Sequence, residues 1–475
     1  MLTSLKFSHL PVLLVILALG ILAGAAVSFV NPAIAFAALI GMVGFVTLAR
    51  DAHWGLYGVI AIVTLLPFAA VPLNVGFSPT LLDLVTLMLV AVWFAQIATG
   101  HRQGWVTTAL DLPIILFLAL VFFAFLLGLG FAGITVNTLR HFVEIIIAVA
   151  LYFVVVNLLR ERAELDRAVQ VMLILGFAAA LVGIFLYVIP DDTATRLLNL
   201  LRVVKYPTGE VLRFIEDNPS LPKRAISTSV DPNVLGGMLI LLVSLAVPQW
   251  FAARRLFRRE ILLAMIAVMG VCLLLTFSRG SLLGATVSVA FVAFALLARR
   301  MPVLLAAIAT LVGIVLAAVL GFVVLSVLPP TQAYADHLLE GLLGQDRATL
   351  MRFGEYKDAL NLISRYPWFG VGFTGVPDVD LYVGVSSLYL LVASRMGLVG
   401  LAAFLLLMTT FVVNRWLLYR RLPAVDPVLL GALAAILGAL VGGVFDHYFF
   451  NLDFPHSVTL FWLFIAIAMS ANRNE

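Results

Sequence analysis

The 475-residue sequence has little charge and a single cysteine. Charged side chains make up 11% of the chain and hydrophobic ones 63%, with a mean hydropathy of +1.14. Soluble domains carry about 25% charged residues, so the composition argues against a soluble fold. With only Cys272, neither a disulfide nor a thiolate metal site can form within one chain. The chain also lacks a P-loop, a dinucleotide-binding glycine turn and an HExxH helix.

Long apolar runs recur along almost the whole chain. A helix needs about 20 mostly apolar residues to cross the hydrocarbon core. The sequence therefore predicts an all-α, polytopic integral membrane protein with about 14 transmembrane helices (12 to 14), formed by residues 1–475 as one domain. The expected spans are approximately Leu10–Val30, Ala33–Leu48, Gly55–Val71, Leu81–Ala98, Leu112–Phe131, Phe142–Leu158, Ala168–Ile189, Val234–Phe251, Ile261–Thr276, Ser281–Ala298, Pro302–Leu328, Met396–Val413, Val428–Phe445 and Phe454–Ser470.

Basic residues in the connections predict the orientation, because Lys and Arg are retained on the cytoplasmic side. If both termini are cytoplasmic, every cytoplasmic segment carries a basic residue, whereas the short outer turns hold only Arg140 and Arg279. The cytoplasmic set is Lys6, Arg50, Arg102, Arg160, Arg162, Arg167, Arg254, Arg255, Arg258, Arg259, Arg299, Arg300, Arg415, Arg420, Arg421 and Arg473.

The same topology places the two longest connections, 190–233 and 329–385, on the extracytoplasmic side. Residues 346–364 of the second loop are predicted to form an amphipathic helix, with Asp346 as the N-cap and an apolar face that includes Leu350 and Phe353. This helix ends before the segment PWFGVGF. It is expected to lie across the outer membrane face as a partial lid.

Three arginines are predicted to lie at the outer boundary. Arg279 lies in TFSRGSLLG between two spans, Arg224 lies in KRAISTSVDPNVLGG, and Arg352 lies on the predicted amphipathic helix. A charge near hydrocarbon marks a candidate functional site, and a guanidinium suits phosphate oxygens. The alternatives are a snorkelling Arg279, a helix-capping segment around Arg224, and a surface ion pair between Arg352 and Glu355.

The last outer turn contains Asp446-His447 and Asp453-Phe454-Pro455-His456. A carboxylate beside a histidine can orient it as a general base, although a polar outer turn would contain such residues anyway. His447 and His456 have no third ligand nearby, so no metal site is predicted. The basic residues are explained by topology and imply no nucleic-acid partner.

Four segments in order resemble the superfamily of O-antigen ligases and O-antigen polymerases, which are bacterial envelope glycosyltransferases. They are RAISTSVDPNVLGGMLILL from Arg224, TFSRGSLLG, RFGEYKDALNLISRYPWFGVGF from Arg352, and SSLYLLVASRMGLVGLAAF. The resemblance covers roughly Arg224 to Phe404. The spans before it match in hydropathy only.

The resemblance implies a metal-independent enzyme without a cofactor, in the cytoplasmic (inner) membrane of a bacterium. Such an enzyme takes a glycan from an undecaprenyl or other polyprenyl diphosphate carrier at the outer face and transfers it to a glycan or lipid acceptor. Arg224 and Arg352 match family arginines thought to hold the diphosphate, and Arg279 matches the arginine of the SRG element.

One departure from the family concerns the base. Ligases of the family usually carry a His-Asn pair where this chain has Ser386-Ser387. A repeat-unit polymerase, or a relative with another acceptor, is therefore favoured over lipid A core ligation. His447 backed by Asp446 is the first candidate for the base, and Asp380 is the second.

Two other functions compete with this interpretation. A lipid-linked oligosaccharide flippase or other transporter should carry charges deep in several spans, short loops on both sides and related halves. A scaffold membrane protein would not need the ordered set of arginines. Charges clustered at the outer ends and long loops on one side favour the glycosyltransferase.

Overall fold

The structure is a computed structural model that describes residues 32–71, 78–100, 104–327, 339, 343–344, 347–375, 385–451 and 453–471. Helices dominate these residues, and the one sheet among them has two strands. The predicted span Leu10–Val30 lies outside the described part of the chain.

Every other predicted span falls on a helix. These helices are α2 (Pro32–Arg50), α3 (His53–Leu65), α4 (Leu81–Ala98), α5 (Asp111–Gly128), α6 (Val136–Leu158), α7 (Arg162–Val188), α9 (Pro232–Phe251), α10 (Arg259–Leu275), α11 (Arg279–Leu297), α12 (Val303–Val327), α15 (Leu388–Arg421), α16 (Pro427–Gly442) and α17 (Pro455–Ser470). Within the described residues, eight helices are long and apolar enough to cross a membrane: α4, α5, α6, α7, α9, α11, α12 and α15. The protein is therefore a helical, multi-pass membrane protein, and about 14 crossings stays a prediction.

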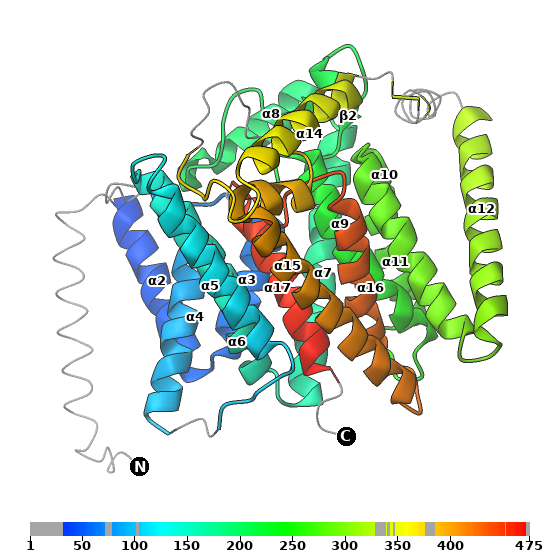
Figure 1. The fold of residues 1–475 in the computed structure, drawn as a ribbon, viewed down its shortest axis with the longest axis horizontal. Coiled ribbons are helices and arrows are strands. Elements are labelled where there is room, and N and C mark those ends of the chain that lie inside the picture. The colour runs from blue at the N-terminus through cyan, green and yellow to red at the C-terminus, as the bar shows by residue number, and fades with distance from the viewer. Residues whose placement is uncertain are drawn as a thin grey trace, which may run out of the picture.

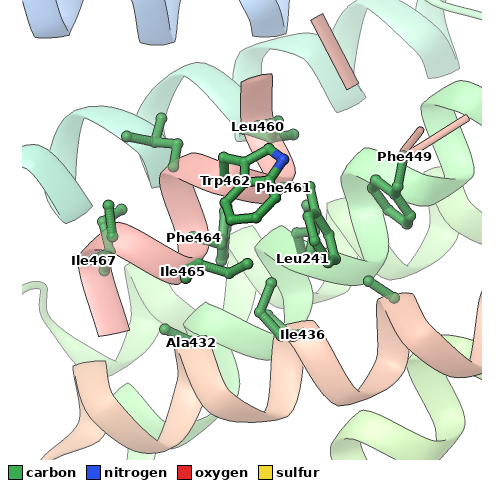
Figure 2. Close-up of a cluster of buried hydrophobic side chains, with 14 of the residues drawn as sticks. Leu241, Ala432, Ile436, Phe449, Leu460, Phe461, Trp462, Phe464, Ile465 and Ile467 are labelled. Carbon is green, nitrogen blue, oxygen red and sulfur yellow. The ribbon is translucent and has the colours of Figure 1, made fainter. Parts of the chain in front are cut away.

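The core of the bundle lies where α9, α16 and α17 meet. Figure 2 shows Leu241 of α9, Ile436 of α16 and Phe461 and Trp462 of α17 packed together, all of them almost fully buried. These helices are apolar on all sides, as expected for helices surrounded by other helices. Gly284 of α11 and Gly438 of α16 allow a close crossing, since a Cβ on either would lie 2.6 Å from the other's carbonyl oxygen.

The described parts of the two long predicted loops lie together at one end of the bundle, at the top of Figure 1. The first contains α8 (Asp191–Leu200), the 3₁₀ turns η2 (Leu201–Val204) and η3 (Ile215–Asp217), and strands β1 (Arg213–Phe214) and β2 (Lys223–Arg224). The second contains α14 (Arg347–Arg365), where the sequence predicts a helix over residues 346–364. The proposed cap, Asp346, lies outside the described residues.

A break in α15 anchors the segment that follows α14. Gly397 has φ +68 and is not helical, and a Cβ there would lie 2.2 Å from the carbonyl carbon of Trp368. The chain after α14 enters this break, where Leu398 N–H donates to Pro367 C=O at 2.7 Å and Val371 N–H donates to Ser394 C=O at 3.0 Å. The span predicted to begin at Met396 therefore begins beside a break, and α15 itself starts at Leu388.

Candidate functional site

Arg224, Arg279 and Arg352 line one cavity of about 100 Å³ beneath the two long loops. They come from three separate segments: β2, the first residue of α11, and α14. Tertiary structure thus joins arginines that are more than 50 residues apart in the chain. The described residues that line it are Ile215, Glu216, Arg224, Asn233, Phe277, Ser278, Arg279, Ala348 and Arg352.

Backbone hydrogen bonds and neutral side chains fix Arg224. Strand β2 pairs with β1 in the register Arg213 to Arg224, and Ala225 N–H donates to Leu275 C=O at the end of α10 at 2.7 Å. The Arg224 guanidinium donates from Nε to Thr276 C=O and from Nη2 to the Asn233 side chain, both at 2.8 Å. Burial lowers the pKa of Arg224 to about 10, so the group stays charged at neutral pH.

Arg279 begins α11 directly after a tight joint with α10. Phe277 in this joint has φ +53, in the left-handed region that non-glycine residues seldom occupy. The joint points the positive end of the α11 dipole, together with Arg279, at the cavity. Arg279 Nη2 also donates to Thr349 Oγ1 of α14 at 3.3 Å, which connects α11 to the loop helix.

Helix α14 contributes Ala348 and Arg352 from one face, four residues apart. The same face continues to Ala359 and Leu362, which are buried, so α14 presents Arg352 inward. The helix begins against the first loop, where Arg347 N–H donates to Glu216 Oε1 at 3.4 Å. Among the described residues, Arg352 has no hydrogen bond or ion pair.

Backbone strain concentrates around the cavity. Glu216 and Phe277 line it with positive φ angles, and Asp217, Ser227 and Val230 in the adjoining segments also have positive φ. Non-glycine residues in this conformation cost of order 1–3 kcal/mol each and cluster at functional sites. Sequence patterns gave no sign of Glu216, whose position depends on such a turn, and Asn233 reaches the cavity from the first turn of α9.

The predicted base lies outside this lining. His447 Nδ1 is 3.6 Å from Asp446 Oδ1, while the His447 backbone N–H donates to the same oxygen at 2.8 Å. Burial raises the pKa of Asp446, and the charges of His447 and Arg352 partly offset this rise. Arg352 is therefore close enough to act electrostatically on the turn that holds the predicted base. The second candidate, Asp380, lies outside the described residues.

The suggested ion pair between Arg352 and Glu355 does not form. Instead, Glu355 Oε2 accepts the Ser386 backbone N–H at 2.9 Å. The neighbouring Tyr356 hydroxyl donates to Ser386 C=O at 3.0 Å and lies 3.2 Å from Val444 C=O. Spacing along a helix shows which residues share a face but not which distant backbone group they meet.

A second charged cluster lies on α4 and α6. Arg140 Nε lies 2.9 Å from Glu144 Oε1 and Arg140 Nη2 lies 3.9 Å from Asp83 Oδ2, while His141 Nδ1 lies 3.0 Å from Glu144 Oε2. The adjoining cavity is only about 10 Å³, roughly the space of one water. Across the described part of the chain, no three His, Cys, Asp or Glu side chains are grouped to hold a metal ion.

Comparison with known families places these features in context. Residues 262–405 match the family model described as O-antigen ligase. The match shows that this part of the chain, from α10 into α15, is similar to the O-antigen ligase family. Arg279, Arg352 and Ser386-Ser387 lie within the matched residues, and Arg224 precedes them. No curated protein matches the chain.

Proposed function

We propose that this chain transfers or polymerises glycan from a polyprenyl diphosphate carrier, such as undecaprenyl diphosphate, at the outer face of the bacterial cytoplasmic membrane. The observation that carries the proposal is the convergence of Arg224, Arg279 and Arg352 on one cavity. The match of residues 262–405 to the O-antigen ligase family supports it.

The arginines suit the chemistry of the leaving group. When the anomeric carbon separates from the carrier, negative charge grows on the diphosphate, and positioned donors stabilise that charge. Guanidinium groups bind phosphate oxygens bidentately and stay charged, so the proposed reaction needs no divalent metal. Among the described residues, the lining contains three arginines and one carboxylate, Glu216.

The acceptor is proposed to attack from the side opposite the diphosphate, which inverts the anomeric configuration. A sugar hydroxyl is a poor nucleophile at neutral pH, so a base is expected to contribute about 10²–10⁴-fold. His447 beside Asp446 is the candidate that the sequence suggests. Because Ser386-Ser387 replace the usual His-Asn pair of ligases, we favour a repeat-unit polymerase or a relative with an acceptor other than lipid A core.

The arginine site is tested by transfer with purified protein in EDTA. The donor is the polyprenyl diphosphate-linked glycan that accumulates in cells lacking this chain. Arg224→Gln, Arg279→Gln and Arg352→Gln should each lower transfer by about 10²–10³-fold. Arg365→Gln is the matched control, because Arg365 ends α14 about 20 Å from Arg352 at 1.5 Å per residue.

Two results would contradict this proposal. A requirement for divalent metal would remove the arginine mechanism, and wild-type transfer by the cavity variants would remove the site. Movement of the lipid-linked glycan across a bilayer without transfer would instead favour a transporter.

The outer-face location is tested by cysteine labelling in a Cys272→Ala background. Ser220 lies in the first long loop, and Arg258 lies between α9 and α10. Ser220→Cys should react with an impermeant thiol reagent in intact cells, and Arg258→Cys should react only after lysis. Labelling at position 258 in intact cells would show that the true topology is the reverse of the proposed one.

A further inference from the structure

Glu355 lies one helical turn from Arg352 on α14, outside the lining of the arginine cavity. Glu355 follows Arg352 by three residues on α14, and side chains at this spacing are neighbours, with about 5–6 Å between Cβ atoms. Its Oε2 accepts the Ser386 N–H at 2.9 Å. The side chain is half-buried, so the carboxylate is turned toward the protein rather than free in solvent.

Hydrogen bonds fix the surroundings of this carboxylate. Tyr356 donates to Ser386 C=O, so α14 holds both the N–H and the C=O of Ser386. Leu388 N–H in turn donates to Gly443 C=O at 2.7 Å and to Asp446 C=O at 3.0 Å. The middle of α14, the start of α15 and the turn between α16 and α17 are thereby joined, which is the preorganisation that a catalytic group requires.

We propose that Glu355 is the general base that activates the acceptor hydroxyl. This inference rests on the proposed function, because it assumes a diphosphate donor against the arginines. The attacking oxygen starts about 3–3.5 Å from the anomeric carbon, and that carbon is bonded to the diphosphate oxygen. A base for this hydroxyl must therefore lie within about one sugar of Arg352, as Glu355 does.

The step balances without a further reactant. The acceptor oxygen forms a bond to the anomeric carbon while its proton passes to the Glu355 carboxylate. The bond between the anomeric carbon and the diphosphate oxygen breaks, and the polyprenyl diphosphate leaves with that electron pair beside the arginines. Glu355 then releases the proton to solvent.

Glu355 fits this role better than His447. His447 Nδ1 is buried and has no hydrogen-bond partner among the described residues, and its 3.6 Å separation from Asp446 is too long for the bond that would orient the ring. His447 follows Asp446 in a turn, whereas Glu355 shares a helix face with Arg352.

Three substitutions distinguish the loss of a general base from the loss of the hydrogen bond that Glu355 makes to Ser386. Glu355→Gln removes the base but keeps an oxygen that can accept the Ser386 N–H, and Glu355→Ala removes both. Asp358→Asn is the matched control, since Asp358 is the next carboxylate on the same helix and is also half-buried. The assay is transfer from the accumulated lipid-linked donor, with inorganic pyrophosphate as a competitor to report occupancy of the arginine cavity.

Glu355→Gln should lower kcat by about 10²–10⁴-fold, with the donor KM and pyrophosphate inhibition within about threefold of wild type. Added formate should restore part of the activity of Glu355→Ala. Asp358→Asn should behave as wild type. Near-normal kcat in Glu355→Gln, or loss of activity only in His447→Ala, would overturn the inference. Loss of pyrophosphate inhibition on changing Arg352, with Glu355→Gln active, would leave the arginine site standing without this base.

Discussion

The arginine cavity and the cluster on α4 and α6 both place arginine beside carboxylate, but their charge balance differs. In the cluster, Arg140 lies between Glu144 and Asp83, and His141 contacts Glu144 as well. In the cavity, Glu216 is the one carboxylate that the described residues place in the lining beside the three arginines. A buried charge must be paired or it is costly, so the cluster needs no further ion, whereas we propose that the arginines of the cavity accept an anion.

The two sites also differ in space. The cluster surrounds about 10 Å³ and the cavity about 100 Å³. Excess charge together with room for a group larger than water is what distinguishes a ligand site from a structural ion-pair network. Variants of the cavity should therefore lose transfer activity, whereas variants of the cluster should lose folding stability.

The largest effect is expected from Arg352→Lys. The substitution keeps a positive charge but loses the bidentate fork that matches phosphate oxygens. Transfer should fall by roughly 10²-fold or more, on the order of the 3–4 kcal/mol that one oxyanion donor supplies, while thermal stability changes little. Turnover with the lipid-linked donor measures the loss, and Arg365→Lys at the end of the same helix is the control. A fully active Arg352→Lys would mean that charge alone suffices in the cavity.

Arg140→Gln should act on stability instead. It leaves Glu144, whose side chain is only 5% exposed, beside Asp83 without the arginine. Breaking a buried pair costs about 3–5 kcal/mol, and we expect about 2–3 kcal/mol here because Arg140 is partly exposed. Thermal unfolding in detergent measures it, and the double variant Arg140→Gln/Glu144→Gln should recover part of the loss. If Arg140→Gln lost transfer activity with unchanged stability, the cluster would have a functional role like that of the cavity.

Hydropathy located the helices well because a membrane span is a property of local composition. The predicted span Leu81–Ala98 coincides with α4, and each of the other predicted spans in the described residues falls on a helix. The break in α15 was missed because Gly397 lies within an otherwise helical stretch. Its positive φ depends on contact with Trp368, which comes from another segment.

For the site, the sequence singled out the three cavity arginines through their motifs and their predicted outer position. It did not identify Glu216, whose carboxylate reaches the cavity through a left-handed backbone turn, nor the contact of Glu355 with Ser386. Both depend on how loops fold back onto helices, which the periodicity of the sequence does not predict.

Glu216→Gln sharpens the comparison by making the cavity more positive. The change removes the one carboxylate that the described residues contribute to the lining, and it keeps an oxygen for the Arg347 N–H. Inorganic pyrophosphate should inhibit transfer at concentrations about three- to tenfold lower, equivalent to about 1 kcal/mol. Glu210→Gln is the control, because Glu210 is exposed in the same loop. Weaker inhibition in Glu216→Gln would show that this carboxylate supports the cavity rather than opposing an anion.

The smallest effect concerns the turn between α16 and α17. Burial raises the pKa of Asp446 in the folded protein, so the folded state holds its proton at pH values where the unfolded chain has released it. Between the ordinary aspartate pKa near 3.9 and the raised value, the folded state binds more protons. The contribution of this group to stability therefore falls as pH rises through that window.

Asp446→Asn keeps an oxygen for the His447 N–H and removes this dependence, so the variant should gain about 1–2 °C in Tm relative to wild type at neutral pH. The gain should shrink as pH falls toward 4. Tm measured across pH in detergent tests this, with Asp453→Asn, exposed near the end of the same turn, as the control. A gain that grows toward low pH would show that Asp446 is held ionised by Arg352 and belongs to the charge balance of the arginine cavity.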